Sequence, residues 1–311
     1  MAHQLSIRED GTAEMAYVGH VPWHHLGTQL LPSAPKRRWL EAAGFDHDIK
    51  SQPVRYTVGE ETYVCTDRVM MYRSDNNRPL GVVSKDYQIV QPHEVLDFFD
   101  EIVKSGNMTL ETAGTLFGGK QYWALAKIAE GAVLDRDVIK GYLLLATSCD
   151  GSRKTVGKKT SVRVVCDNTL RMSDDDTTDM IEVSHRSRFD ADAVKKALGV
   201  APVSFKEFIA NLDKLAKKPI RKARAEAMTK KVFGEEARAV PHVMELFGGE
   251  AMGYDIPGFA GTTFGWLQSC TEYVDHWSYA KTGSHRISNS LLGRGDQRKS
   301  KAFKLALEFA S

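Results

Sequence analysis

The sequence contains few cysteines and no long apolar segment. Its 311 residues include four cysteines, which are far apart, and no Cys-x-x-Cys pair occurs. Disulfide scaffolds need a denser arrangement than this, so we expect reduced thiols. No run of about 18 apolar residues is present to span a bilayer, and the polar start of the chain lacks the apolar core of a signal peptide. The sequence therefore predicts a cytoplasmic protein without a membrane partner.

The chain also lacks a strong excess of charge and the common nucleotide and metal motifs. It has 42 basic and 40 acidic residues, a formal net charge of +2. Only the local distribution of charge can therefore indicate a polyanionic partner. The phosphate-binding pattern Gly-x-x-x-x-Gly-Lys-Ser/Thr is absent, and so is the zinc pattern with two histidines around a glutamate on one helix. The sequence predicts no cofactor and favours a binding protein over an enzyme.

Residues 51–186 carry the patterns of strands. Branched and aromatic residues recur at 54–58, 62–65 and 69–73, with a tight turn expected at Gly59-Glu60. Two further strand pairs are expected across Gly118-Gly119 and across Asp150-Gly151, because these residues favour turns. A helix that begins near Pro92 has apolar residues on one face. This block is therefore predicted to be an α+β core.

The rest of the chain favours helices more than strands. Residues 189–233 have a helical composition broken by Pro202 and Pro219, and helices are also expected at 262–277 and 296–310. The first fifty residues show little periodicity, apart from a short helix that closes at Gly44. The predicted fold class is α+β, with antiparallel strands packed with helices and a mainly helical C-terminal part. The predicted parts are an N-terminal arm (1–50), an α+β core (51–186) and a mainly helical C-terminal region (187–311).

Three clusters of basic residues are the most specific candidate sites. Residues 153–163 include five basic residues and no acidic one, residues 213–231 include eight basic and two acidic residues, and a third cluster follows Gly293. The candidate nucleic-acid-binding residues are Arg153, Lys154, Lys158, Lys159 and Arg163 in the first cluster, Lys217, Lys218, Arg221 and Lys222 in the second, and Arg298 and Lys299 in the third.

Basic clusters suit a phosphate backbone, because each neutralised phosphate releases counterions. A hairpin with a basic tip can follow one nucleic-acid strand, and single-stranded DNA is the favoured partner. The alternative is that these lysines only solvate the faces of helices, and for 213–231 the two interpretations are about equally supported. In 153–163 the binding interpretation is favoured, since five positive charges so close together repel one another unless a counter-charge lies nearby.

A metal site is a second possibility. Glu272 and His276 are four residues apart on a predicted helix, so they share a face with each other and lie close to Asp275. With further histidine ligands they would form the metal site of an enzyme that acts on nucleic acid. The alternative is that hydrogen bonds and salt bridges hold these side chains in a helix interface. The further ligands would be His24, His25 or His285.

A cysteine nucleophile is a third possibility. Cys149 and Cys166 end adjacent predicted strands, but nothing in the local sequence provides a histidine partner for either thiol. Cys166 follows two valines, which favours a buried thiol that packs as a small apolar side chain.

Several segments together resemble a known family. The densest matches are Pro22-Trp23-His24-His25-Leu26-Gly27, Asp150-Gly151-Ser152, Val162-Arg163-Val164-Val165-Cys166, Asn168-Thr169-Leu170 and Thr271-Glu272-Tyr273-Val274-Asp275-His276. Over nearly its whole length the chain is similar to the phage- and plasmid-type proteins grouped as domain of unknown function 932. The resemblance implies that the protein is carried by a mobile element and acts in the host cell, which favours a role in DNA metabolism. It implies no catalytic residues.

The leading hypothesis is a nucleic-acid-binding protein of the recombination or single-strand annealing type that works as a homo-oligomer. The core of strands with a packed helix and a basic hairpin resembles the ring-forming annealing proteins of phages in outline. Two alternatives remain open: the metal-assisted enzyme described above, and a host-defence antagonist that acts by binding a host protein.

Overall fold

The structure is a computed structural model that describes residues 5–19, 26–104, 108–163, 168–171, 180–198, 202–234 and 238–311. The strands are β1 (Met15–Val18), β2 (Thr28–Leu30), β3 (Ile49–Val58), β4 (Glu61–Arg73), β5 (Pro79–Ser84), β6 (Thr109–Leu116), β7 (Gln121–Val133), β8 (Asp137–Ser148), β9 (Thr155–Arg163), β10 (Asn168–Arg171) and β11 (Met180–Val183). The helices are α1 (Lys36–Ala43), α2 (Pro92–Lys104), α3 (Ala191–Leu198), α4 (Pro202–Lys217), α5 (Lys222–Phe233), α6 (Ala239–Glu245), α7 (Thr263–Glu272), α8 (Gly283–Leu292) and α9 (Arg294–Ala310), with π-helical turns at Leu246–Glu250 and Tyr273–Trp277. This confirms the predicted α+β class.

The strands of the described residues form two sheets. An eight-stranded sheet has the order β10-β9-β8-β7-β6-β1-β2, with β11 also paired to β9, and a smaller sheet has the order β3-β4-β5. Neighbouring strands are antiparallel except for the parallel pair β1 and β2. The predicted turns are confirmed: Gly118 and Gly119, both with positive φ, join β6 to β7, and Asp150-Gly151 lies between β8 and β9.

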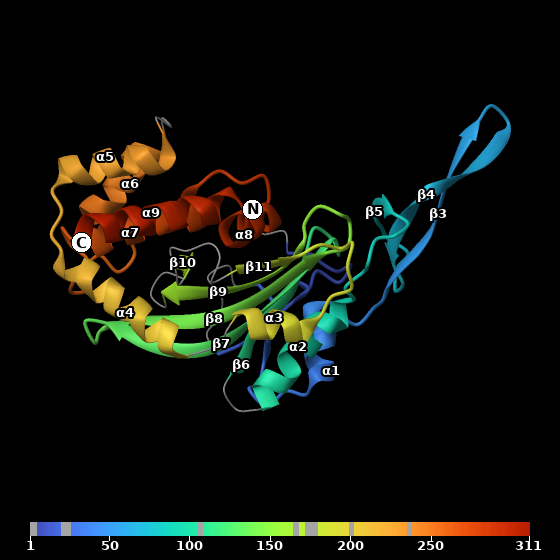
Figure 1. Ribbon diagram of the computed structural model, residues 1–311, viewed down its shortest axis with the longest axis horizontal. Coiled ribbons are helices and arrows are strands. Elements are labelled where there is room, and N and C mark those ends of the chain that lie inside the picture. The colour runs from blue at the N-terminus through green and yellow to red at the C-terminus, as the bar shows by residue number, and fades with distance from the viewer. Residues whose placement is uncertain are drawn as a thin grey trace.

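Both faces of the large sheet are covered (Figure 1). Successive side chains of β7 point to opposite faces. Tyr122 and Ala124 belong to a core with α1 and α2, whereas Trp123 and Leu125 belong to a core that includes Leu291 of α8. Double coverage explains why β7 and β8 are continuous apolar runs rather than alternating ones. None of the described helices is long and apolar enough to cross a membrane.

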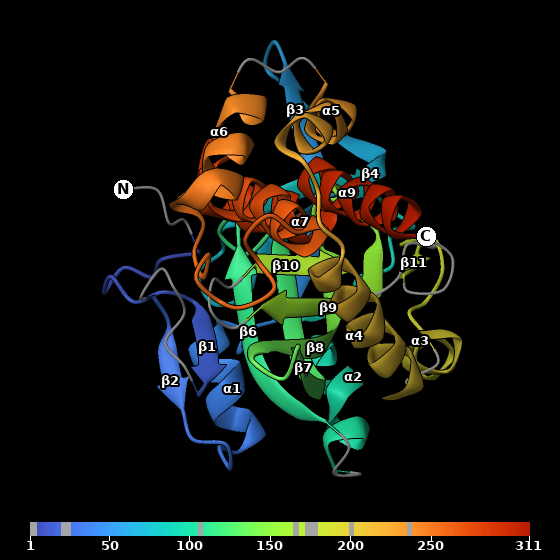
Figure 2. The same ribbon diagram turned by 90° about the vertical axis from the view of Figure 1, so that its left-hand side faces the viewer.

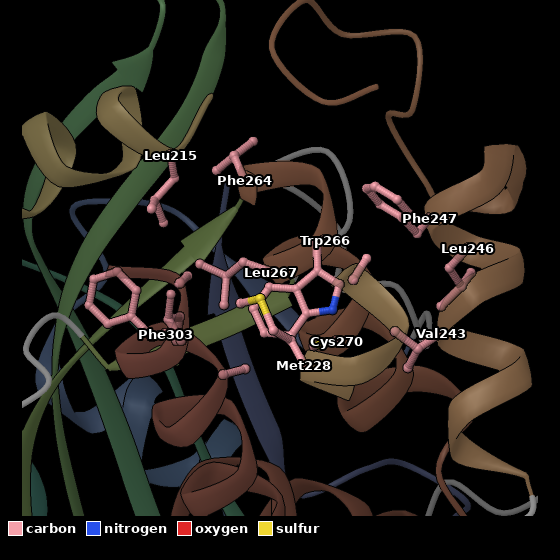
Figure 3. Close-up of a cluster of buried hydrophobic side chains, with 14 of the residues drawn as sticks. Leu215, Met228, Val243, Leu246, Phe247, Phe264, Trp266, Leu267, Cys270 and Phe303 are labelled. Atoms are coloured by element: carbon pink, nitrogen blue, oxygen red, sulfur yellow. The ribbon is translucent and has the colours of Figure 1, made fainter. Parts of the chain in front are cut away.

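Helices α4 to α9 form a second layer, and all of them except α8 contribute to a core of their own. Pro202 begins α4 and Pro219 separates α4 from α5, as predicted. The core centres on Trp266 of α7, which is fully buried and donates a hydrogen bond from its indole nitrogen to Thr229 Oγ1 at 2.9 Å (Figure 3). Figure 2 shows α5, α6, α7 and α9 gathered on one side of the sheet, above β9 and β10.

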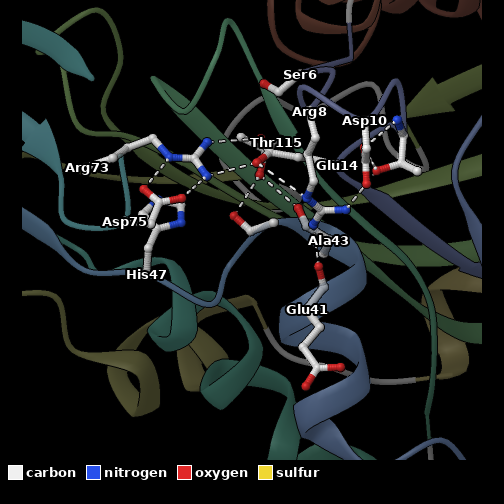
Figure 4. Close-up of polar contacts among 12 residues, drawn as sticks. Ser6, Arg8, Asp10, Glu14, Glu41, Ala43, His47, Arg73, Asp75 and Thr115 are labelled. Atoms are coloured by element: carbon white, nitrogen blue, oxygen red, sulfur yellow. Dashed lines mark hydrogen bonds and ion pairs between the residues drawn. The ribbon is translucent and has the colours of Figure 1, made fainter. Parts of the chain in front are cut away.

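A polar network at the base of β3 and β4 fixes the smaller sheet to the large one (Figure 4). Arg73 of β4 donates two hydrogen bonds to the carboxylate of Glu14, at 2.8 and 3.0 Å, and two more to Asp75. Beside it, the Nε2 atom of His47 lies 2.9 Å from the hydroxyl of Tyr122. Burial, together with the charge of Arg73, lowers the pKa of His47 to about 4. His47 is therefore neutral in the folded protein at neutral pH.

Candidate nucleic-acid interface

The structure buries two of the basic residues predicted in the first cluster. Lys158 and Lys159 are consecutive on β9, so their side chains enter opposite faces of the sheet. In the register of β8 and β9, Lys158 lies opposite Leu144, which belongs to the core on the side of α8. Lys159 lies opposite Leu143, which belongs to the core on the side of α2. Only 1% of Lys158 and 6% of Lys159 is exposed. Neither ammonium group is open to a nucleic-acid strand in this conformation.

The cations of the first cluster meet the end of helix α8 and the start of α9. Lys158 Nζ lies 2.5 Å from Asp296 Oδ1 and donates to the carbonyl oxygen of Leu291. Arg153 donates to the carbonyl oxygen of Leu292 and to Ser288 Oγ, both at 2.9 Å. Carbonyl groups at a helix C-terminus carry partial negative charge and lack helical partners. These two cations therefore cap α8 and join the sheet to the helical layer.

The remaining residues of the first cluster are Lys154 and Arg163. Lys154 is exposed and forms an ion pair with Glu182 at 2.7 Å. The backbone of Arg163 belongs to β9, but its side chain lies outside the described residues. The counter-charge that the sequence argument required is therefore present for Lys154 and Lys158.

The two candidate residues of the third cluster, Lys299 and Arg298, are buried and half-buried and contact other helices. Lys299 of α9 is 1% exposed and lies 2.6 Å from Asp275 Oδ1 and 3.1 Å from Ser290 Oγ. Arg298 lies over the ring of Phe233 at 5.4 Å from its centroid. These contacts hold α9 against the turn that follows α7, against α8 and against the end of α5, which is a structural role.

The second cluster lies on the surface. We call Lys217, Lys218, Arg221, Lys222 and Arg224 the α4–α5 surface, because they occupy the end of α4, the connection and the start of α5. All are exposed except Lys218, which is half-buried. Among the described residues none of them forms an ion pair, whereas Lys230, further along α5, pairs with Glu226 at 3.2 Å. The structure thus keeps these five positive charges together without a described counter-charge.

Phe309 of α9 organises part of this surface. Lys218 Nζ and the guanidinium carbon of Arg224 each lie 5.4 Å from the centre of its ring. Cations are attracted to the face of an aromatic ring. The ring therefore holds two cations from different sides of the α4–α5 connection beside each other.

A pocket of about 790 Å³ lies where the smaller sheet meets the β8–β9 connection. Arg153 and Lys154 line it, and so do Arg68, His185 and Arg186, which the sequence reasoning missed. His185 is buried, stacks on the ring of Tyr87 at 4.4 Å and lies 2.9 Å from the carbonyl oxygen of Gln88. Acidic Asp86 and Asp150 also line this pocket, so its charge is more balanced than that of the α4–α5 surface.

The residues considered for a metal site make other contacts. Glu272 accepts a hydrogen bond from the backbone of Met252 at 3.0 Å, and Asp275 pairs with Lys299. The described residues contain no group of three histidine, cysteine or acidic side chains arranged to hold a metal ion. The Nδ1 atom of the exposed His285 lies 2.7 Å from the hydroxyl of Thr282. His24 and His25 lie outside the described residues.

The cysteines that were considered as nucleophiles differ in how they are placed. Cys149 is buried, and burial raises the pKa of its thiol to about 12, with the neighbouring charge of Asp150 as a smaller cause. A thiol with such a pKa is protonated at neutral pH and is a weak nucleophile. Cys166 lies outside the described residues.

Comparison with known proteins identifies a family but no activity. No curated protein and no solved structure matches the chain. The profile of one family matches residues 79–292, which span strands β5 to β11 and helices α2 to α8. This match covers more than half of the chain and includes the α4–α5 surface. The protein therefore belongs to the family described as domain of unknown function (DUF932).

Proposed function

We propose that this protein binds the phosphate backbone of nucleic acid, single-stranded DNA in preference, with its α4–α5 surface. We further propose that it serves a phage or other mobile element in strand annealing or recombination, as a homo-oligomer. The observation that carries the binding proposal is the position of two cations, Arg221 and Lys222, at the start of α5, where they do not stabilise the helix.

The helix dipole distinguishes the cations at the start of α5 from Lys217 at the end of α4. The N-terminus of a helix carries partial positive charge, so cations there are unfavourable, by about 0.3–1 kcal/mol each. Arg221 occupies the N-cap of α5 without a side-chain cap, Lys222 is the first residue, and the first turn has no acidic residue. Lys217, in the last turn of α4, is in the position that the dipole favours. Stabilisation of the helices therefore explains Lys217 but not Arg221 and Lys222.

An anionic ligand offsets this unfavourable charge. Free backbone N–H groups and the helix dipole favour phosphate at a helix N-terminus, and exposed arginine and lysine add to that attraction. Contacts of this kind reach the sugar-phosphate backbone and leave base edges free. A strand bound in this way remains able to pair with a complementary strand, which is what annealing requires.

The test is a salt titration of binding to a labelled single-stranded oligonucleotide. Replacing Arg221→Gln and Lys222→Gln together is expected to reduce the slope of log affinity against log salt by about 1.4, or 0.7 for each phosphate that is no longer neutralised. The matched control is Lys230→Gln with Lys231→Gln, which removes the same charge from the last turn of the same helix.

The control variant is expected to keep most of the salt dependence, because its cations lie away from the connection. Equal losses in the two variants would show that only net charge matters, and would overturn the assignment of the α4–α5 surface. Absence of binding by the unaltered protein at low salt would overturn the proposed function as a whole.

A further inference from the structure

A second pocket, also of about 790 Å³, opens at the turn that joins β6 to β7. Its lining includes this turn, residues 5–7, the β8–β9 connection and the first half of α8. Arg78, the residue before β5, also lines it. We call this cavity the turn pocket. It is a neighbour of the pocket described above, because Asp150 lines both.

Two buried serine hydroxyls line the turn pocket and have protons to donate. Ser6 is 7% exposed and Ser284 is 1% exposed. The Ser6 oxygen accepts a hydrogen bond from the backbone N–H of Gly118 at 2.9 Å, and the Ser284 oxygen accepts one from that of Phe117 at 3.3 Å. Among the described residues, neither hydroxyl donates to an acceptor. A buried donor without an acceptor is unfavourable, so an acceptor that enters the pocket would stabilise both.

Two cations line the pocket without an ion pair to any described residue. They are the exposed Arg78 and the half-buried Lys120. Gly118 has a φ of +70°, and a Cβ atom there would lie 2.5 Å from the guanidinium carbon of Arg78. Because glycine has no Cβ atom, the guanidinium group packs against the backbone of the turn. Arg78 is therefore held beside the same residue whose N–H binds Ser6.

Asp150 is the one acidic residue in the described lining of the pocket. Its Oδ1 atom accepts two hydrogen bonds from Ser152, one from the backbone at 3.0 Å and one from the hydroxyl at 2.5 Å. Arg153 lies behind the lining and donates to Ser288 Oγ, which lines the pocket, at 2.9 Å. This guanidinium group forms no ion pair with the described residues, and it interacts electrostatically with Asp150. Arg153 therefore offsets part of the negative charge of Asp150.

The charged groups next to the turn compensate one another. Arg73 binds both Glu14 and Asp75, and Arg8 lies 3.9 Å from Glu14. These two cations and two carboxylates add no net charge. The lining of the turn pocket therefore keeps an excess of positive charge, which an anion in the pocket would balance.

Helix α8 begins at the pocket. Its first turn includes Ser284 and His285 and no acidic residue. The N-terminus of a helix carries partial positive charge, so it adds to the attraction that Arg78 and Lys120 exert on an anion. The pocket thus combines hydrogen-bond donors with positive charge.

We propose that the turn pocket binds a phosphate monoester, either a free mononucleotide or the terminal phosphate of a nucleic-acid strand. A monoester carries about −1.5 to −2 charges at neutral pH and has three terminal oxygen atoms that accept hydrogen bonds. It therefore matches two cations and two serine hydroxyls. A phosphate within a strand carries a single charge and has two of its oxygens bonded to sugars, so it matches the pocket less well. The site is separate from the α4–α5 surface and goes beyond the proposed function.

Calorimetric titration of the full chain with deoxyadenosine monophosphate tests the site, and deoxyadenosine is the matched ligand that lacks the phosphate. We expect the unaltered protein to bind the monophosphate at least about tenfold more tightly than the nucleoside. Arg78→Gln with Lys120→Gln is expected to lower that affinity about tenfold or more, because each cation contributes a charge-assisted hydrogen bond. The control is Arg68→Gln with Arg186→Gln, which removes two exposed cations from the neighbouring pocket and is expected to keep the affinity.

Removing the carboxylate of the lining is expected to have the opposite effect. Asp150→Asn keeps an oxygen that accepts from Ser152 but removes the charge that repels the phosphate, so binding of the monophosphate is expected to tighten about threefold or more. A misfolded variant would not gain affinity. Unchanged or weaker binding by Asp150→Asn would contradict the assignment of the phosphate to this pocket.

Oligonucleotides with and without a terminal phosphate distinguish the two sources of the monoester. Tighter binding of the phosphorylated strand, lost in the variant with Arg78→Gln and Lys120→Gln, identifies the strand end, whereas equal binding of the two strands beside binding of the monophosphate identifies the free nucleotide. The site assignment is overturned if neither phosphorylated ligand binds better than its counterpart, or if the two double variants lose affinity equally. The variant with Arg221→Gln and Lys222→Gln is expected to keep the affinity for the monophosphate, so failure of the proposed function is distinguished from failure of this site.

Discussion

The cations of β9 and those of the α4–α5 surface are similarly dense in the sequence but lie in opposite environments. Lys158 is enclosed between the sheet and α9 and contacts Asp296, whereas Arg221 and Lys222 are exposed and have no described carboxylate partner. The repulsion within a dense cluster of cations can thus be offset in two ways. One is an internal counter-charge from a distant segment, and the other is an external anion.

The difference between the two regions follows from their secondary structure. A central strand with both faces covered has no solvent-facing side, so a lysine there must be paired or lose its charge. A helix connection at the surface leaves side chains in water, where unpaired cations cost little. Local charge in a sequence therefore indicates a ligand site only after the layer in which it lies is known.

Breaking the buried pair is expected to have the largest effect on stability. Lys158→Met leaves Asp296 buried without its cation, and we expect it to lower the free energy of unfolding by about 3–5 kcal/mol. Chemical denaturation measures this change. The control is Lys154→Met, because the exposed pair of Lys154 with Glu182 is expected to contribute less than about 1 kcal/mol.

A double variant sharpens this prediction. Lys158→Met with Asp296→Leu removes both charges, and it is expected to be more stable than Lys158→Met alone, because no unpaired buried charge remains. A loss for Lys158→Met no larger than that for Lys154→Met would show that the pair in β9 behaves like a surface pair.

Acid is expected to destabilise the folded protein through the buried side chain of His47. The folded pKa of His47, about 4, lies below its ordinary value of 6.5, so the unfolded chain binds a proton more readily. The contribution of neutral His47 is fully present above pH 6.5 and is lost as the pH falls toward 4, on the order of 3 kcal/mol. His47→Gln is expected to flatten this part of the stability profile.

Thermal unfolding of the unaltered and His47→Gln proteins between pH 4 and 7 provides the measurement. Parallel profiles for the two proteins would show that His47 is not the group responsible.

The smallest expected effect is a gain in stability from removing the exposed cations. Arg221→Gln with Lys222→Gln relieves unfavourable charge at the start of α5 and is expected to stabilise the protein by about 0.5–1 kcal/mol. Lys230→Gln with Lys231→Gln removes favourable charge from the last turn and is expected to destabilise it slightly. Thermal unfolding at low salt shows whether the two changes have opposite signs.

Most of the long strands and helices could be predicted from local sequence patterns. The hairpins across Gly118-Gly119 and Asp150-Gly151, and the helices bounded by Pro202 and Pro219, are confirmed because turn residues act locally. Strands β1 and β2 were not predicted, since segments of four and three residues carry too little periodicity. Helix α8 was missed because its serines and asparagine obscure its apolar side.

The candidate site was less predictable than the fold. Both interpretations of residues 213–231, phosphate binding and solvation of helix faces, expected Arg221 and Lys222 to be exposed, so their exposure does not decide between the two. The burial of Lys158 depends on Asp296, 138 residues away, and no local pattern indicates such a contact. Residues such as Arg68 and His185 share a pocket only because the smaller sheet folds onto the β8–β9 connection.

The contact between Lys158 and Asp296 also affects the order of events during synthesis. The ribosome makes the strand long before the helix that neutralises it: 138 residues separate the two side chains, which takes roughly 7–28 s at about 5–20 residues per second. Until α9 emerges, the nascent sheet keeps a charged lysine and the apolar side chains around it accessible to solvent. The growing chain therefore presents an unfinished face to chaperones during this interval, and the arrival of α9 closes it.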